Sequence, residues 1–412
     1  MKVLILDSAP PATAFSGKSV RFLNIFKRLG LRHELHYLAI VGRSDSLVVP
    51  AWLQEVVAST QVWRRKELES QFGRYANWVR AQPWFYAPWR YPADYRTLSA
   101  SLRQQVEDQG IDMVHCFDEE VAQFIPDDLP CPWILDQGDA MALHAARRSQ
   151  QAKGLLQKLR WRSMAWRLAR YERQMVNRAQ AAVFVSPVDA ACYGTNGSRA
   201  QVQVIPNGVD SSYFAPLASN PLQIQAPTLL FTGHLSFEPN REAARWLIDE
   251  LLPRIRREVS HVVCAIVGAD PTPDLLERQD ARWVIVTGRV KDLRPYFEEA
   301  SVYVCPMHLG AGIKNKLLEA MAMEKAIVTT PRAAEGLPVR DGEHLLLAEG
   351  AEGMAARVIE LLYDPARREA LGRQARRLVV ERYSWELSSQ AYEQLYQRLY
   401  ARRTRIAAEV AV

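Results

Sequence analysis

The chain has 412 residues, of which 48% are hydrophobic and 24% are charged, and its formal net charge is +6 at pH 7. This length exceeds what one hydrophobic core usually organises, so we expect two domains of similar size. The composition excludes a low-complexity or disordered chain, whereas the positive charge leaves nucleic acid, anionic lipid and phosphorylated ligands as partners.

The first half of the chain alternates short apolar runs with helical patterns. The runs that we predict as strands are residues 3–6, 34–40, 113–116, 133–135, 181–185 and 202–205. Such β-α alternation is typical of a parallel sheet that helices cover on both faces.

Residues 147–178 are strongly basic, with ten Lys or Arg and a single acid, Glu172. Apolar residues recur there at near-helical spacing, which predicts a basic amphipathic helix. One interpretation is a domain helix whose basic face is solvated. The other is a patch that docks on anionic lipid at the cytoplasmic face of a membrane. A nucleic-acid partner is disfavoured, because the helix has little of the repeated aromatic interleaving that is expected of a platform for stacking bases.

A turn at residues 205–210, IPNGVD, stops the last strand of the first half, and a polar stretch follows at 211–227. The alternation then restarts, with predicted strands at 228–232, 262–267, 283–286, 302–305, 326–329 and 345–347. We therefore predict an α/β fold of two doubly wound domains, 1–207 and 208–383. A helical segment at 384–412 should cross back to the first domain.

The cysteines and the apolar stretches of the sequence bear on the cellular location of the protein. The 5 cysteines are odd in number and form no C-x-x-C pair, which indicates neither a disulfide framework nor a cysteine zinc site. No uninterrupted apolar stretch approaches the ~18 residues that span a bilayer. Residues 1–2 lead straight into the apolar run 3–6, so we do not expect a signal peptide. We expect a cytoplasmic protein, peripheral on the inner face of the plasma membrane if the basic helix docks there.

The most informative motif follows the strand at residues 302–305, where PMHLGAGIKNKLLEAMA forms a glycine-rich turn and then a helix at 306–322. Glycines let a backbone approach an anion closely, and a helix N-terminus presents free N–H groups. Lys314 and Lys316 add cations. Glu319 lies about two turns into the helix, where a carboxylate can accept from both hydroxyls of a ribose. The motif predicts a nucleotide site.

At these residues the chain resembles the retaining glycosyltransferases of family 4, which have the GT-B fold of two Rossmann-like domains facing across a cleft. Other segments match the family in order: IPNGVD at 205–210, FTG at 231–233, GRVKD at 288–292, EG at 335–336 and DG at 341–342. The variant PNREA at 239–243 and the GAGIKNK turn are most similar to sugar transferases of bacterial exopolysaccharide and exosortase (PEP-CTERM) loci.

The resemblance implies a role for each matching residue. Glu319 is the second Glu of the family's Glu-x7-Glu motif and binds the ribose, Arg289 and Val290 lie where the base is gripped, and Gly17 approaches the diphosphate from the first domain. The implied donor site comprises Gly17, Gly233, His234, Arg289, Val290, Ala311, Gly312, Ile313, Lys314, Lys316, Leu318 and Glu319.

Three positions depart from the family pattern. Ala311 replaces the first Glu of the motif, which contacts the donor sugar. His234 and Asn240 replace the basic pair for the diphosphate. Phe117 replaces the first-domain histidine, although His115 lies two residues before it. The missing Glu puts the identity of the donor in doubt.

Negative charge that builds on a departing nucleoside diphosphate must be met by donors already in place. Lys314, Lys316, Arg241 and the helix N-terminus could supply these donors, and Lys314 and Arg241 are catalytic candidates. His115 is a third catalytic candidate, because it lies near the position of the family's first-domain histidine. A core histidine at a strand end is the alternative for His115. Candidates for acceptor contacts are Asp118, Asp136 and Asp139, near the ends of first-domain strands.

No Asp-x-Asp triplet, His-Glu-x-x-His motif or P-loop occurs, so neither a metal nor a cofactor is expected. We predict a metal-independent, retaining hexosyltransferase that uses a UDP- or GDP-sugar donor and a glycan or glycolipid acceptor in cell-surface or exopolysaccharide synthesis. Two alternatives stay open: a nucleotide-sugar 2-epimerase of the same fold, and a nucleotide-sugar binding protein without turnover.

Overall fold

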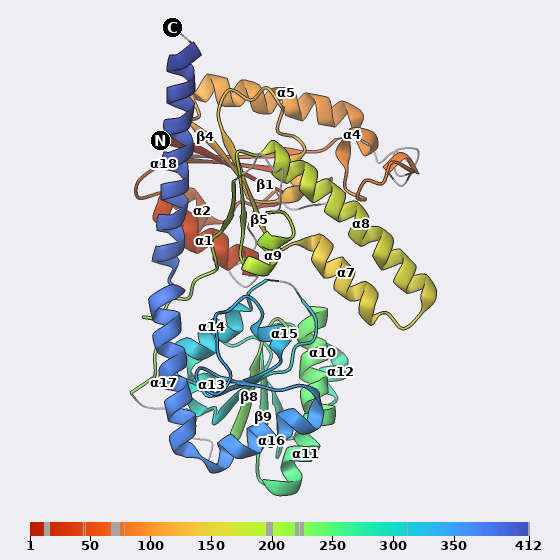
Figure 1. Cartoon of the computed structure of the whole chain (residues 1–412), viewed down its shortest axis with the longest axis vertical. Coiled ribbons are helices and arrows are strands. Elements are labelled where there is room, and N and C mark those ends of the chain that lie inside the picture. Colours follow the sequence, from red (N-terminus) through yellow and green to blue (C-terminus); the bar gives the residue numbers. More distant parts are fainter. Residues whose placement is uncertain are drawn as a thin grey trace. The chain divides into compact units, whose positions relative to one another are not determined.

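The computed structural model describes residues 1–11, 17–43, 45, 47–66, 75–77, 79–194, 201–218, 222, 226–310 and 312–410, with side chains up to 405. The chain forms two compact units. One is Met1–Pro206 together with the segment from Ser388 onward, and the other is Asn207–Leu387. Each unit holds one parallel sheet flanked by helices (Figure 1).

The sheet of the first unit has seven parallel strands in the order β3-β2-β1-β4-β5-β6-β7. Their bounds are β1 (Lys2–Asp7), β2 (Glu34–Val41), β3 (Ser59–Arg64), β4 (Met113–Cys116), β5 (Trp133–Gly138), β6 (Ala181–Phe184) and β7 (Gln201–Val204). The strand order reverses between β1 and β4, which pair directly with Leu6 opposite Cys116. Such a switch point is where open α/β sheets bind ligands, beyond the carboxyl ends of the strands.

The described helices of the first unit follow in chain order. They are α1 (Gly17–Leu29), α2 (Ala51–Val56), α4 (Ala87–Arg90), α5 (Pro92–Gln109), α6 (Glu119–Ala122), α7 (Met141–Gln151), α8 (Leu155–Arg178), α9 (Pro187–Ala191) and most of α18 (Trp385–Val410). Gly110 ends α5 at φ 62°, a left-handed backbone that glycine adopts without strain. Figure 1 shows α7 and α8 side by side as a hairpin that extends away from the sheet.

The second unit has a six-stranded parallel sheet in the order β10-β9-β8-β11-β12-β13, so its switch point lies between β8 and β11. The strands are β8 (Thr228–Thr232), β9 (Val263–Val267), β10 (Val284–Val286), β11 (Val302–Cys305), β12 (Ile327–Thr329) and β13 (Leu346–Leu347). Strands such as β9 and β11 are buried along their whole length, as expected of a parallel sheet between helices.

The helices of the second unit are α10 (Glu238–Trp246), the π-helical turn η1 (Leu247–Leu251), α11 (Leu252–Glu258), α12 (Pro273–Leu276), α13 (Arg294–Glu299), α14 (Asn315–Ala322), α15 (Pro331–Ala334), α16 (Gly350–Tyr363) and α17 (Pro365–Arg382). Across the described parts of both units, no helix combines the length and the apolar character that a bilayer crossing requires.

Candidate functional site

The loop between β11 and α14 is anchored by the neighbouring strand. At the end of β12, Thr329 Oγ1 donates to the carbonyl of Cys305 at 2.9 Å, and Thr330 Oγ1 donates to the carbonyl of Met307 at 2.5 Å. Both threonine side chains are buried. The first residues of the loop are therefore fixed to the sheet before the glycines begin.

The glycine-rich turn itself requires glycine at two positions. Gly310 has φ 113° and Gly312 has φ 65°, a region that strains residues with a side chain. A Cβ on Gly310 would also lie 3.2 Å from Lys314 Nζ. Ala311, at the place of the family's first Glu, lies outside the described residues.

Helix α14 starts directly after this turn. Its cap residue, Lys314, provides no side-chain hydrogen bond to the first turn. The N–H groups there carry a partial positive charge that attracts anions. The buried Lys314 ammonium donates to the carbonyl of Gly312 at 2.8 Å, which holds the cation beside the turn. The start of α14 thus has the features of an anion site.

The second lysine points toward the end of β8. Lys316 Nζ donates to Asn240 Oδ1 at 2.5 Å and lies 4.6 Å from the centre of the Phe231 ring. Burial lowers the pKa of Lys316 to about 8, because a buried ammonium loses its hydration. Lys316 is still mostly protonated at neutral pH and can meet a phosphate.

Glu319 lies one turn further along α14 and is half-buried. Burial raises the pKa of its carboxyl to about 7, although the nearby charge of Lys316 opposes that shift. Within the described part of the chain, no hydrogen bond or ion pair engages this carboxylate. A shielded carboxylate with a raised pKa and no protein partner is typical of a ligand-binding group.

Two glycines make room around Lys316. A Cβ on Gly233, just beyond β8, would lie 2.9 Å from both Asn240 Cγ and Lys316 Nζ. A Cβ on Gly268, just beyond β9, would lie 1.7 Å from the Gly233 carbonyl oxygen, so these two backbones need glycine to approach so closely. The loops after β8 and β9 therefore meet closely, beside Lys316 of α14.

The residues that replace the family's basic pair belong to the same region. Asn240 is buried, and its Nδ2 donates to the carbonyl of His234 at 2.9 Å. His234 Nδ1 lies 2.9 Å from Ser236 Oγ, and its Nε2 lies 3.1 Å from Asp270 Oδ2. Asn240 thus positions Lys316 and fixes the loop, whereas the partly exposed His234 faces an acid.

Arg241, the other catalytic candidate of the second unit, has acidic surroundings among the described residues rather than contacts with Lys314 or Lys316. Its charge adds to that of Arg245 in lowering the pKa of Asp274, and Arg245 Nε lies 2.6 Å from Asp274 Oδ2. Arg241 Nε is buried and has no hydrogen-bond partner in the described part of the chain. No contact among those residues joins Arg241 to the two lysines, so its catalytic role stays a prediction.

The positions predicted to hold the base lie beyond β10. Gly288 has φ 70° and turns the chain there. Arg289 Nη2 lies 3.9 Å from Asp270 Oδ2, and Val290 packs half-buried against the core. Ile313 and Leu318 are buried in the same core. Their side chains position the turn and α14.

In the first unit, His115 is completely buried at the end of β4. Its Nδ1 lies 2.5 Å from the hydroxyl of Tyr396, and its Nε2 lies 3.4 Å from Asp136 Oδ2 without the geometry of a hydrogen bond. Burial lowers the pKa of His115. These surroundings match the core interpretation of His115 rather than the catalytic one.

Asp136 belongs to the same buried cluster. Arg21 Nη2 lies 3.3 Å from Asp136 Oδ1, and the Tyr392 hydroxyl donates to Oδ2 at 2.5 Å. Burial alone would raise the pKa of Asp136, but the Arg21 charge, together with the neighbouring His115 and the hydrogen bond from Tyr392, holds that pKa at about 2. Tyr392 and Tyr396, both on α18, and Arg21 were not singled out in the sequence.

The remaining first-unit candidates follow β4 or β5 or begin α1. Asp118 caps α6, because its Oδ1 accepts from the N–H of Glu120 at 2.8 Å. Asp139 is exposed after β5, and Gly17 is exposed as the first residue of α1. Phe117 packs against Phe22, with ring centroids 5.1 Å apart. Residues 15 and 16, before Gly17, lie outside the described residues.

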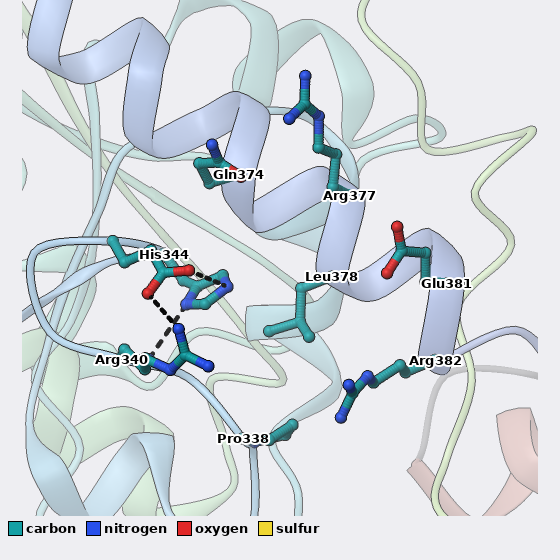
Figure 2. Close-up of a pocket in the computed structure, with 9 residues that line it drawn as sticks. Pro338, Arg340, His344, Gln374, Arg377, Leu378, Glu381 and Arg382 are labelled. Carbon is teal, nitrogen blue, oxygen red and sulfur yellow. Dashed lines mark hydrogen bonds and ion pairs between the residues drawn. The ribbon is translucent and has the colours of Figure 1, made fainter.

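A separate hollow of about 390 Å³ lies in the second unit, between α17 and the loop after α15 (Figure 2). Arg340 Nη1 lies 2.8 Å from Glu343 Oε2 at its edge, and its backbone N–H donates to His344 Nδ1 at 3.1 Å. Acids and arginines alternate around it, and none of the predicted site residues lines it.

Residues 226–364 match the family model for glycosyl transferases group 1. This segment contains the glycine-rich turn, both lysines and Glu319.

Two curated relatives are mannosyltransferases. The GDP-mannose-dependent alpha-(1-6)-phosphatidylinositol monomannoside mannosyltransferase of Mycolicibacterium smegmatis is 25% identical over 52% of this chain and 61% of that protein. The phosphatidyl-myo-inositol mannosyltransferase of Mycobacterium tuberculosis is 29% identical over 47% of this chain and 53% of that protein. The chain therefore matches less than two thirds of the length of either relative.

Solved structures of similar fold cover nearly the whole chain. Sucrose-phosphate synthase from Thermosynechococcus elongatus has a TM-score of 0.70 and 18% identity over 97% of this chain and 100% of its own. Anabaena HepE in complex with UDP has a TM-score of 0.68 and 16% identity, and the match covers 96% of this chain and 100% of HepE. With the two parallel sheets, this likeness confirms the predicted α/β GT-B fold. Together the comparisons support a group 1, family 4-like glycosyltransferase and do not favour a 2-epimerase.

Proposed function

We propose that this chain is a glycosyltransferase that binds its nucleotide-sugar donor at the turn between β11 and α14. The observation that carries the proposal is Glu319. Its half-buried carboxylate has no partner among the described residues and lies in the field of Lys316. A ribose with its 2′ and 3′ hydroxyls supplies the two donors that such a carboxylate lacks.

The donor in this proposal is a UDP- or GDP-sugar. HepE was solved in complex with UDP and also with UDP and glucose, and the Mycolicibacterium relative is GDP-mannose-dependent. Arg289 and Val290 are the proposed contacts of the base. They lie just beyond Gly288, on the loop that leaves β10.

The proposed reaction is a retaining transfer in which the nucleoside diphosphate leaves and the acceptor hydroxyl attacks from the same face. The bond between the anomeric carbon and the diphosphate oxygen breaks, and the bond between the anomeric carbon and the acceptor oxygen forms. The acceptor O–H bond breaks as well, and its proton passes to the leaving diphosphate oxygen. Lys314, Lys316 and the N–H groups of α14 would meet the charge on the leaving group. We propose that these groups suffice without a metal ion or a cofactor.

The proposed acceptor is a glycan or glycolipid of exopolysaccharide synthesis, at the inner face of the plasma membrane. The α7–α8 hairpin supports a membrane-bound acceptor. Leu168, on the C-terminal part of α8, is buried in the core, whereas Leu155 and Leu156 at the hairpin tip are 73% and 84% exposed. The neighbouring Lys158 is exposed as well. Exposed leucines among cations fit an anionic lipid surface.

Donor binding and turnover test this proposal together. Thermal shift with UDP, GDP and ADP and their common sugar conjugates should reveal stabilisation by one uridine or guanosine family. Free nucleotide should then appear faster when glycan acceptors are added. Glu319→Ala is the control and should lose both signals. Nucleotide binding without any release across acceptors would instead favour a binding protein without turnover.

A further inference from the structure

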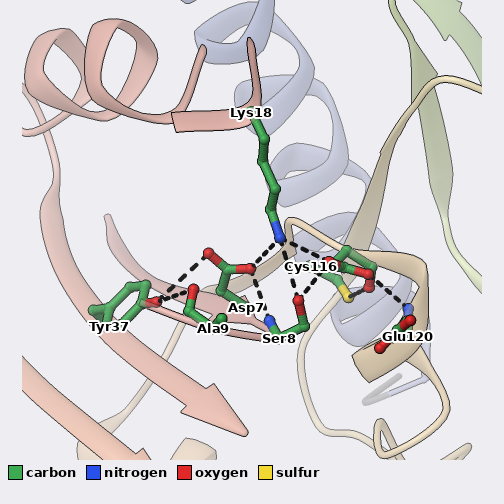
Figure 3. Close-up of polar contacts among 8 residues, drawn as sticks. Asp7, Ser8, Ala9, Lys18, Tyr37, Cys116 and Glu120 are labelled. Carbon is green, nitrogen blue, oxygen red and sulfur yellow. Dashed lines mark hydrogen bonds and ion pairs between the residues drawn. The ribbon is translucent and has the colours of Figure 1, made fainter. Parts of the chain in front are cut away.

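A second polar cluster lies in the first unit, at the switch point between β1 and β4. Asp7 ends β1, Ser8 follows it, and Asp118 follows β4, while Lys18 comes from the first turn of α1. Figure 3 shows the Lys18 side chain reaching down between the ends of these two strands. The sequence had singled out only Asp118 of these four residues.

The ammonium of Lys18 contacts the other three residues of the cluster. Its Nζ donates to Asp7 Oδ1 at 2.7 Å, to Asp118 Oδ2 at 2.7 Å and to Ser8 Oγ at 3.3 Å. Although burial opposes it, the two carboxylates raise the pKa of Lys18, so the ammonium stays charged. Of its three hydrogen bonds the one to Ser8 is the longest, and it is the one that a ligand oxygen would replace most easily.

Asp118 is held in one orientation by groups on both sides. Its Oδ2 accepts from Ser8 Oγ at 2.5 Å as well as from Lys18, and its Oδ1 accepts from the N–H of Glu120 at 2.8 Å. A carboxylate offers about four acceptor positions, so one remains for a ligand. Asp7 lies deeper: it bonds Lys18 and the N–H of Ser8, and Tyr37 OH lies 3.5 Å from its Oδ2.

Exposure decides which groups a ligand can reach. The side chain of Lys18 is 42% exposed and that of Asp118 is 16% exposed, whereas that of Asp7 is 1% exposed. Lys18 and Asp118 therefore form the accessible face of the cluster. Asp7 lies behind them and fixes Lys18.

The charges select a class of ligand. Two carboxylates outnumber one ammonium, which disfavours a phosphate or another anion. A metal cation is disfavoured as well, because the Lys18 ammonium already occupies the position between the carboxylates. A neutral hydroxyl can donate to Asp118 and accept from Lys18 at the same time.

We infer that Lys18 and Asp118 bind the hydroxyl groups of a sugar ring at the acceptor side of the reaction, with Ser8 and Asp7 as positioning residues. The assignment to the acceptor rests on the proposed transferase function. The binding of a sugar ring at this cluster does not, because all four residues belong to the first unit.

The experiment uses the full chain and two probes. Saturation-transfer NMR measures binding of the methyl glycosides of glucose, galactose, mannose and N-acetylglucosamine, and calorimetry measures binding of UDP and GDP. The variants are Lys18→Met, Asp118→Asn and Ser8→Ala. Lys27→Met, an exposed lysine on the same helix α1, is the matched control.

We expect at least one methyl glycoside to bind the wild type and Lys27→Met alike. Its affinity should fall about 10-fold or more in Lys18→Met and Asp118→Asn, because each change removes a charge-assisted hydrogen bond. Ser8→Ala is the variant least able to disturb folding and should weaken the glycoside less. Nucleotide affinity should stay unchanged in all four variants.

Three results would overturn the inference. They are the absence of glycoside binding to the wild type, unchanged glycoside binding in both charge variants, and loss of nucleotide rather than glycoside affinity in Lys18→Met. The last result would assign Lys18 to the donor. Glycoside binding without any nucleotide binding would refute the proposed function while leaving the sugar site in place.

Discussion

The ammonium of Lys316 lies 2.5 Å from the amide oxygen of Asn240, across the space that Gly233 leaves open. Asn240 in turn donates to the carbonyl of His234, so the loop after β8 and the start of α14 are fastened to each other. This contact holds the lysine beside the glycine-rich turn.

Gly233→Ala should disturb this arrangement selectively. The new Cβ would lie 2.9 Å from Asn240 Cγ and from Lys316 Nζ, so the lysine must move away. Affinity for UDP or GDP should fall about 10-fold, the loss of one charge-assisted hydrogen bond, while the fold survives. Calorimetric titration measures the effect. Gly154→Ala is the matched control, because a Cβ there meets nothing within 4 Å. Equal affinity in both variants would contradict the placement of Lys316.

Nucleotide affinity should have a maximum between about pH 7 and pH 8. Because burial raises the pKa of Glu319 to about 7, its carboxylate becomes protonated below about pH 7 and then has fewer acceptor positions for the ribose hydroxyls. Above about 8 the lowered pKa of Lys316 removes the ammonium that meets the phosphates. Binding of UDP and GDP measured across this range checks both limbs.

Two variants separate these limbs from titration of the nucleotide itself. Glu319→Gln cannot ionise and should remove the limb due to Glu319, whereas Lys316→Arg stays charged and should flatten the alkaline limb. Profiles of both variants that match the wild type would contradict the assignment.

The buried cluster around Asp136 should contribute strongly to stability. Tyr392→Phe removes a hydroxyl that donates to Asp136 Oδ2 at 2.5 Å. A hydrogen bond to a charged group contributes about 1.5–3 kcal/mol, so the free energy of unfolding should fall by that amount. Urea denaturation followed by circular dichroism measures it. Tyr400→Phe, on the same helix but outside the cluster, should change it by less than about 0.5 kcal/mol. Equal effects of both variants would refute this role.

The exposed tip of the α7–α8 hairpin should govern binding to anionic membranes. Leu156→Glu should reduce sedimentation with phosphatidylglycerol vesicles, because Leu156 is 84% exposed and would place an acid at the lipid surface. Added salt should weaken wild-type binding, since exposed charges are screened over ~10 Å at 0.1 M. Leu31→Glu is the matched control, also 84% exposed but outside the hairpin. If neither added salt nor Leu156→Glu changes vesicle binding, the hairpin tip is not the membrane-binding surface.

Much of the fold could be predicted because buried parallel strands are continuous apolar runs, as in β9 and β11. The edge strand β3 was missed. Its residues, STQVWR, are only half-buried, and they contain no such run. The sequence predicted one basic helix over residues 147–178, with a core and a membrane interpretation both open. The structure divides this segment between α7 and α8, and the buried residues of α8 begin at Leu168.

Local sequence also predicts the nucleotide site around Glu319 better than the cluster around Lys18. Glu319, Lys314 and Lys316 follow one another within a single motif, so local sequence predicts them together. Partners far apart in the chain could not be found. Lys316 and Asn240 are 76 residues apart, and Lys18 and Asp118 are 100 residues apart. Only the order of the strands in each sheet brings such residues to one switch point.

The measurement that tests the central claim most directly compares two nucleotides on two proteins. We expect UDP or GDP affinity to fall from wild type through Glu319→Gln to Glu319→Ala, the last by about 10²-fold or more, because two charge-assisted hydrogen bonds are lost. The matching 2′,3′-dideoxy nucleotide lacks both hydroxyls and should bind wild type and Glu319→Ala almost equally. If Glu319→Ala loses affinity for the dideoxy nucleotide just as severely, or unfolds, Glu319 is structural and the nucleotide site is wrongly placed.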